Sequence, residues 1–189
     1  LDTAIHKLSI PTRGHVPGLS GLSGQLQADL FGGRFILDSD TLTITIPGVF
    51  RNPQTMTAGR GEISWKRRGT GWWFETPGLS LSNADISGAV LGKLHWPYGN
   101  SLPILDLGLQ VTSANLAHLD SYLPLGLLRP RVASWMQRAI KSGYIHDAAI
   151  WYRGYAGDFP FDSADGLLAS GHIEDVSVDY SRRWPSIDG

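Results

Sequence analysis

Six histidines are the residues best suited to bind a metal ion or to transfer protons near neutral pH. They stand at positions 6, 15, 95, 118, 146 and 172. None shows the spacing of four residues, or the supporting carboxylates, that build a metal site on one element. The chain contains no cysteine, which excludes disulfides, thiolate metal sites and cysteine nucleophiles. We therefore expect neither a metal nor a cofactor.

Residues for nucleophilic or acid–base catalysis are present but poorly spaced. The serines of the glycine-rich segment 18–24 do not occupy the centre of a Gly-x-Ser-x-Gly motif. The carboxylate pairs, Asp38 with Asp40 and Asp162 with Asp165, stand beside serine or glycine, which is typical of turns. We therefore predict a protein that is not an enzyme. A carbohydrate-active enzyme, which would bring distant carboxylates together near tryptophans, is the third hypothesis.

Length and charge limit the other function classes. The 189 residues suit one domain, 1–189, and the formal net charge of -1 gives no basic surface of the kind that binds nucleic acid. Apolar runs are too short to cross a bilayer, and no signal sequence opens the chain. Because the chain opens at Leu1 directly into mixed sequence, we expect a segment of a larger protein whose anchor lies elsewhere.

The elements that would position any site are mostly strands. Alternation of apolar and polar residues indicates half-buried strands. The clearest sets are Leu42, Ile44 and Ile46; Leu105, Leu107, Leu109 and Val111; and Val176, Val178 and Tyr180. Clusters rich in glycine, proline and asparagine separate such sets and indicate turns. The pattern predicts an α+β fold that is mostly β, with a strongly bent antiparallel sheet.

One segment has helical spacing instead. Apolar residues from Leu128 to Ile140 recur at helical spacing, with Pro130 near the start of the run and Gly143 just past its end. We therefore predict the main helix near 130–142, and a shorter helical turn at 115–122, ended by Pro124.

The predicted helix is basic. Segment 123–143 contains no Asp or Glu. Its basic and aromatic candidates for contact with a membrane or lipid headgroups are Arg129, Arg131, Trp135, Arg138 and Lys141. A basic face opposite Trp135 and Met136 is typical of a helix at an anionic membrane surface. The alternative is that the apolar stripe packs against one end of the sheet.

The order of short motifs along the chain resembles the YhdP branch of the AsmA-like family, in its central periplasmic region. The motifs are Gly18-Leu-Ser-Gly21, Gly32-Gly-Arg-Phe35, Ile46-Pro-Gly-Val-Phe50, Gly61-Glu-Ile-Ser-Trp65, Gly71-Trp-Trp-Phe74, Leu81-Ser-Asn-Ala-Asp85, His118-Leu-Asp-Ser-Tyr-Leu-Pro124, Gly157-Asp-Phe-Pro-Phe161 and the closing 171–185. They follow one another over most of the sequence. The resemblance implies a periplasmic protein, tethered to the inner membrane, whose sheet forms an open hydrophobic groove that carries phospholipid between the two membranes.

The resemblance implies phospholipid and further segments of the same chain as partners, and it supplies no catalytic residue. Alternating residues would line the groove, and the candidates are Leu42, Ile44, Ile46, Leu105, Leu107, Leu109, Val176 and Val178. The same residues could instead form a closed core. A structural or interaction module of the cell envelope with a filled core is therefore the second hypothesis.

Overall fold

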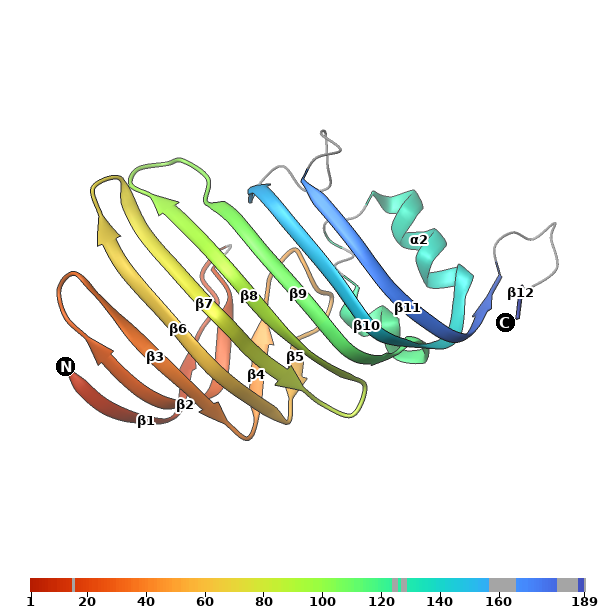
Figure 1. Ribbon diagram of the computed structural model, residues 1–189, viewed down its shortest axis with the longest axis horizontal. Helices are drawn as coiled ribbons and strands as arrows, with labels where there is room; N and C mark the ends of the chain where they lie inside the picture. Colours follow the sequence, from red (N-terminus) through yellow and green to blue (C-terminus); the bar gives the residue numbers. More distant parts are fainter. Residues whose placement is uncertain (15, 124–125, 127–128, 157–165, 180–186, 189) are drawn as a thin grey trace.

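The computed structural model describes residues 1–14, 16–123, 126, 129–156, 166–179 and 187–188. Twelve strands form one open antiparallel sheet (Figure 1), which confirms the predicted, mostly β fold. The strands are β1 (Asp2–Ile10), β2 (Gly18–Ala28), β3 (Gly32–Ser39), β4 (Leu42–Thr45), β5 (Gln54–Met56), β6 (Ala58–Arg68), β7 (Gly71–Ser82), β8 (Ile86–Pro97), β9 (Ile104–Asn115), β10 (Ile140–Tyr155), β11 (Leu167–Val178) and β12 (Ile187–Asp188).

The sheet order is β12-β11-β10-β9-β8-β7-β6-β3-β2-β4-β5, and β1 pairs with β2. From β6 to β11 each strand pairs with the next one in the sequence, so these strands lie side by side as an up-and-down series (Figure 1). Between β9 and β10 the chain forms η1 (Leu116–His118), α1 (Leu119–Tyr122) and α2 (Pro130–Ala139). The predicted helical turn at 115–122 is therefore confirmed, while Pro124 lies outside the described residues.

The best packed part of the protein is the N-terminal end of the sheet. Phe35 and Leu37 of β3 and Leu42 of β4 form a buried cluster, and side chains of β1, β2, β6 and β7 pack against it. A side chain added at Gly59 of β6 would touch Leu37, Leu42 and Leu81, at 3.4–3.5 Å. The side chain of Leu42 in β4 therefore lies over Gly59, beside Leu37 of β3 and Leu81 of β7. It follows that β4 lies across one face of the sheet at this end.

The predicted strands are found, with shifted ends. The set that begins at Leu42 forms β4, which ends at Thr45, and Ile46 belongs to the turn that follows, where its carbonyl accepts hydrogen bonds from Val49 and Phe50. The set 105–111 lies within β9. The last set forms the end of β11 at Val178; Tyr180, like Asp162 and Asp165, lies outside the described residues.

The end predicted for the main helix was wrong. The helix begins at Pro130, as expected, but it ends at Ala139 instead of residue 142. Ile140 is extended (φ -88°, ψ 116°) and pairs with Val178, because a β-branched residue with a partner strand favours sheet over helix. Gly143, expected to terminate the helix, lies within β10 at φ 137°, where a side chain would crowd Leu116 and Val176.

Two glycines allow the long central strands to bend. Gly61 of β6 has φ 141° and Gly92 of β8 has φ 135°, values that residues with side chains rarely adopt. A Cβ atom at either position would collide with the carbonyl oxygen of a neighbouring strand, from Gly78 and Asp106 respectively. Register shifts in the β6–β7 and β7–β8 pairs lie beside these glycines, so the backbone bends there.

Candidate functional site

Cross-strand register places the apolar residues of the central strands on one face. Residues directly opposite in an antiparallel pair point to the same side of the sheet. The rows, from the β7–β8 turn toward the β6–β7 hairpin, are Gly59, Leu81, Gly88, Val111 and Ala148; Gly61, Leu79, Val90, Leu109 and Ile150; Thr76, Gly92, Leu107 and Tyr152; Trp65, Phe74, Leu94, Leu105 and Gly154; and Arg67, Trp72 and Trp96. We call this surface the apolar face.

The apolar face remains accessible over most of its extent. Its leucines are half-buried, and Ile150 and Trp96 are 37% and 44% exposed. Only eight apolar side chains are buried in the described part of the chain, far fewer than a closed core of this size would contain. The accessible surface is 12280 Å², whereas a compact monomer of this mass has about 8,900 Å². The sheet therefore presents an open apolar surface of the kind that marks a binding site.

The predicted lining residues fall into three groups. Leu105, Leu107 and Leu109 lie together on the apolar face. Leu42 is 3% exposed and Ile44 packs beside it, so both belong to the closed core at the N-terminal end, and Ile46 lies in the turn after β4. Val176 and Val178 are half-buried near the end of β11, where Val178 pairs with Ile140.

Sequence reasoning missed the central part of this surface. It did not select the aromatic or aliphatic residues of β7, β8 and β10, namely Trp72, Phe74, Leu79, Val90, Leu94, Ile150 and Tyr152. Trp72 and Phe74 do alternate with other residues, but the adjacent Trp73 points to the opposite face and obscures the period of two. The register shift in β7 between Thr76 and Leu79 also breaks the alternation.

A cluster of polar side chains fastens α1 to the sheet at the β7–β8 turn. His118 Nδ1 donates to Asp85 Oδ1 at 2.6 Å, and the Tyr122 hydroxyl donates to Asp85 Oδ2 at 3.1 Å. Asn83 Nδ2 donates to the Tyr122 hydroxyl at 2.9 Å, and Gln54 of β5 donates to the Ser121 carbonyl at 2.6 Å. The segment after β9 is thereby held against both β5 and the turn before β8.

The same contacts shift two pKa values. The hydrogen bond from His118, the largest effect, lowers the pKa of Asp85 in spite of partial desolvation. Burial raises the pKa of Tyr122, and the neighbouring Asp85 carboxylate acts in the same direction. Both groups therefore stay in the protonation states that this hydrogen-bond arrangement requires, an ionised Asp85 and a neutral Tyr122.

Replacing Asp85 with asparagine should lower the free energy of unfolding at pH 7 by about 1–2 kcal/mol, because the partners of the carboxylate lose a charged acceptor. Since the folded pKa is depressed, this stabilisation is present above the unfolded value of about 4 and is lost as the pH falls through the folded value. Urea unfolding of parent and Asp85→Asn should converge in acid. The exposed Asp120→Asn serves as control, and a constant difference between parent and Asp85→Asn down to pH 2 would contradict this assignment.

The opposite face of the sheet is polar. One of its rows contains alternating charges, and its members are Arg34, Ser64, Glu75, Lys93, Asp106 and Arg153. Lys93 pairs with Glu75 at 3.3 Å and Arg153 with Asp106 at 2.5 Å. These side chains are about half exposed or more, so the ion pairs make this face soluble and add little to stability.

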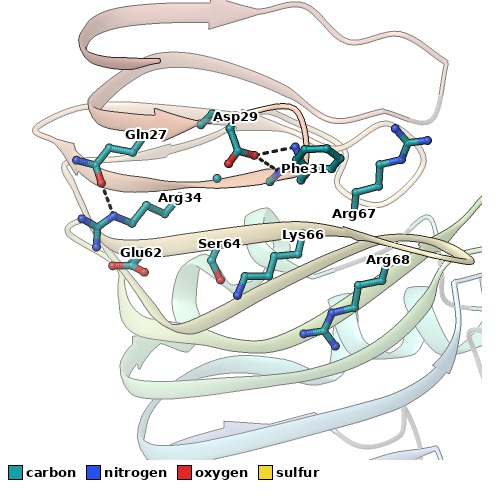
Figure 2. A pocket seen from close by; sticks show the side chains of 12 residues that line it. Gln27, Asp29, Phe31, Arg34, Glu62, Ser64, Lys66, Arg67 and Arg68 are labelled. Atoms are coloured by element: carbon teal, nitrogen blue, oxygen red, sulfur yellow. Dashed lines mark hydrogen bonds between the residues drawn. The ribbon is translucent and has the colours of Figure 1, made fainter.

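A depression of about 670 Å³ lies on the polar face between the β2–β3 hairpin and β6 (Figure 2). Its basic lining residues are Arg34, Lys66, Arg67 and Arg68, and its acidic ones are Glu62 and Asp29. The Asp29 carboxylate accepts hydrogen bonds from the Phe31 and Gly32 amides at 2.7 and 3.0 Å, which makes it part of the hairpin turn. The mixed charges of this hollow suit water, and we place the candidate site on the apolar face.

The predicted membrane-contact residues are accessible. Arg129, Arg131, Arg138 and Lys141 are exposed, and Trp135 is 39% exposed. Only Ala139 of α2 is buried, so the apolar stripe of the helix does not fill one end of the sheet.

The position of the cations around α2 differs from the prediction. Arg131 and Arg138 stand four residues before and three after Trp135, so they border the apolar stripe instead of lying opposite to it. Lys141 lies beyond the end of the helix, in β10.

The described residues contain no group of three or more histidine, aspartate or glutamate side chains placed to hold a metal ion. Among their helices, none has the length and apolar character needed to span a bilayer.

Comparison with known proteins identifies the family. A family model described as YhdP protein matches residues 1–189, the full sequence. Comparisons with curated proteins and with solved structures gave no match. The matched family is AsmA-like and of a lipid-transport type in the bacterial envelope, and it is not a known enzyme family. The open sheet with one apolar face fits such a protein. The chain therefore belongs to the YhdP family of AsmA-like proteins.

Proposed function

We propose that this chain shelters phospholipid acyl chains on its apolar face, as one segment of a periplasmic protein that is tethered to the inner membrane and carries phospholipid to or from the outer membrane. One observation carries the proposal: rows rich in aliphatic and aromatic side chains, with glycines between them, follow one another across β6 to β10, and most of these side chains are half-exposed. A lipid tail is a ligand that needs a long apolar surface and no specific polar contacts.

The energetics favour such a surface as a path for lipid. Each CH₂ group removed from water contributes about 0.8 kcal/mol, so moving a whole acyl chain through water is prohibitively slow. A continuous apolar face lowers this barrier because a tail can slide between equivalent leucine and valine contacts. The sheltered tail also covers apolar area that the folded sheet leaves in water.

The edges of the sheet favour a longer groove made with further segments of the same chain. Within the described residues, the outer edge of β1 pairs with no strand, and β11 pairs on its outer side only through Ser177 and Val178. Unpaired edges accept further strands. We propose that additional strands extend the apolar face on both sides.

The experiment replaces one residue of the apolar face by a charged one. Leu107→Glu places a carboxylate in the middle of the rows, where a bound tail would have to desolvate it. We expect co-purified phospholipid per protein to fall roughly tenfold, since a cost of about 1.4 kcal/mol already gives that factor. The measurement is solvent extraction and native mass spectrometry of protein purified without detergent.

The matched control is Gln110→Glu, which adds the same charge on the same strand. Gln110 is exposed and pairs with Ala89 and Ala149 on the polar face. This variant should retain as much phospholipid as the parent. A parent protein that carries no phospholipid, or an equal loss in both variants, would instead favour the structural or interaction module.

A further inference from the structure

The charges on the apolar face are confined to one position. Within the five rows that define this face, Arg67 is the one charged residue, and it lies at the end of the rows, beside the β6–β7 hairpin. Its row contains Trp72 and Trp96, which lie directly opposite one another. Tryptophan prefers the boundary between apolar and polar surroundings, because one end of its ring donates a hydrogen bond. The row of Arg67 therefore resembles the boundary between apolar and polar surroundings.

Arg67 is also held in place. Its Nε–H donates to the Tyr98 hydroxyl at 2.8 Å, and its guanidinium lies 5.8 Å from the centre of the Tyr98 ring. Among the described residues, the two Nη groups have no hydrogen-bond partner. Figure 2 shows that Arg67 turns away from Lys66 and Arg68, which point over the polar face. A fixed guanidinium with two available NH₂ groups suits a bidentate contact with phosphate.

The distance between the rows, measured along the strands, indicates how a lipid tail would lie on the apolar face. Trp96 and Val90 of β8 are three rows apart, which is six residues or about 20 Å along a strand. One leaflet of a bilayer has acyl chains that span about 15 Å. A tail that starts at the Arg67 row and follows the strands would therefore end between the row of Gly92 and Leu107, about 13 Å away, and the row of Val90 and Leu109.

We propose that Arg67, with Tyr98, Trp72 and Trp96, forms a subsite for the phosphate of a glycerophospholipid, so that the lipid lies along the strands with its headgroup at the β6–β7 end. This inference rests on the proposed function and adds an orientation and a headgroup contact to it. Lys66 and Arg68 take no part, because their side chains belong to the other face.

The first test compares two lipids with identical tails, phosphatidylglycerol and diacylglycerol, that differ in the phosphate-containing headgroup. The delipidated full chain is incubated with vesicles that contain both lipids, and bound lipid is counted by native mass spectrometry. Arg67→Gln should lower retention of phosphatidylglycerol roughly tenfold and leave diacylglycerol unchanged, because only the phospholipid loses a charge-assisted contact. Arg68→Gln, one residue away on the polar face, should change neither, and excess glycerol phosphate should not compete.

Several outcomes would overturn the inference. An unchanged retention of phosphatidylglycerol in Arg67→Gln removes the subsite, and an equal loss of both lipids assigns Arg67 to packing. Displacement by free glycerol phosphate would indicate a site for a free anion instead of a lipid headgroup. If the parent binds neither lipid, the proposed function fails together with the subsite.

The second test measures orientation and uses the absence of cysteine from the chain. Single cysteines introduced by Thr70→Cys, at an exposed position of the β6–β7 hairpin, and by Leu109→Cys carry a bimane fluorophore. Phospholipid with a nitroxide on the headgroup should quench the label at position 70 more strongly, and phospholipid with a nitroxide at the end of the tail should quench the label at position 109 more strongly. The reverse pattern, or equal quenching at both sites, contradicts the orientation while leaving lipid binding itself established.

Discussion

Leu42→Ala should lower the free energy of unfolding by about 3 kcal/mol, whereas Leu107→Ala should lower it by less than about 1 kcal/mol. Leu42 is 3% exposed within the cluster that includes Phe35 and Leu37, so its removal leaves a cavity. Leu107 is half-buried on the apolar face, where water already reaches one side of it. The difference therefore tests whether the face is open in solution.

Urea unfolding of delipidated protein measures both values. Leu37→Ala, at a second buried position of the same cluster, should lower the free energy of unfolding by as much as Leu42→Ala. This variant controls for an effect that is specific to β4. A loss at Leu107 equal to that at Leu42 would mean that a second layer covers the face in solution. Such a result would support the structural module with a filled core and would count against the lipid proposal.

The difference between these two leucines also shows what could not be predicted from the sequence. Leu42 and Leu107 both belong to alternating sets with the same pattern, and both were expected to line one surface. The structure separates them because β4 folds over β3 and β6, whereas within the described part of the chain no strand crosses the sheet at Leu107. Alternation predicts that a strand has an apolar side, but it holds no information on what covers that side.

Features that depend on local chemistry were predictable to a greater extent. The alternating strands, the start of α2 at Pro130 and the helical turn after β9 follow from residue periodicity and proline geometry. Features that depend on register were not. The rows that join Trp72 to Trp96 and Leu79 to Val90 exist because β7 and β8, with Gly92 of β8 at positive φ, stay aligned across a register shift. No short stretch of sequence contains that alignment.

The basic residues near α2 lead to a second proposal, that this helix contacts an anionic membrane surface. Val132 and Trp135 are 43% and 39% exposed, and Arg131 and Arg138 border them on the same side of the helix. In this arrangement the apolar residues can enter the headgroup region while the guanidinium groups reach lipid phosphates. Lys141, which follows in β10, adds a third cation near the helix end.

Reversing these three cations, with Arg131→Glu, Arg138→Glu and Lys141→Glu, should weaken binding to phosphatidylglycerol vesicles at low salt by at least about 3 kcal/mol, or more than about 100-fold, at about 1 kcal/mol for each charge near the surface. Folding should change little, because all three side chains are exposed. Sedimentation with sucrose-loaded vesicles measures the partition. The control reverses Arg13, Arg51 and Lys66, which are exposed elsewhere and change the net charge equally. If both triple variants lose binding to the same extent, the attraction reflects net charge alone, and if neither loses it, α2 has no contact with the membrane.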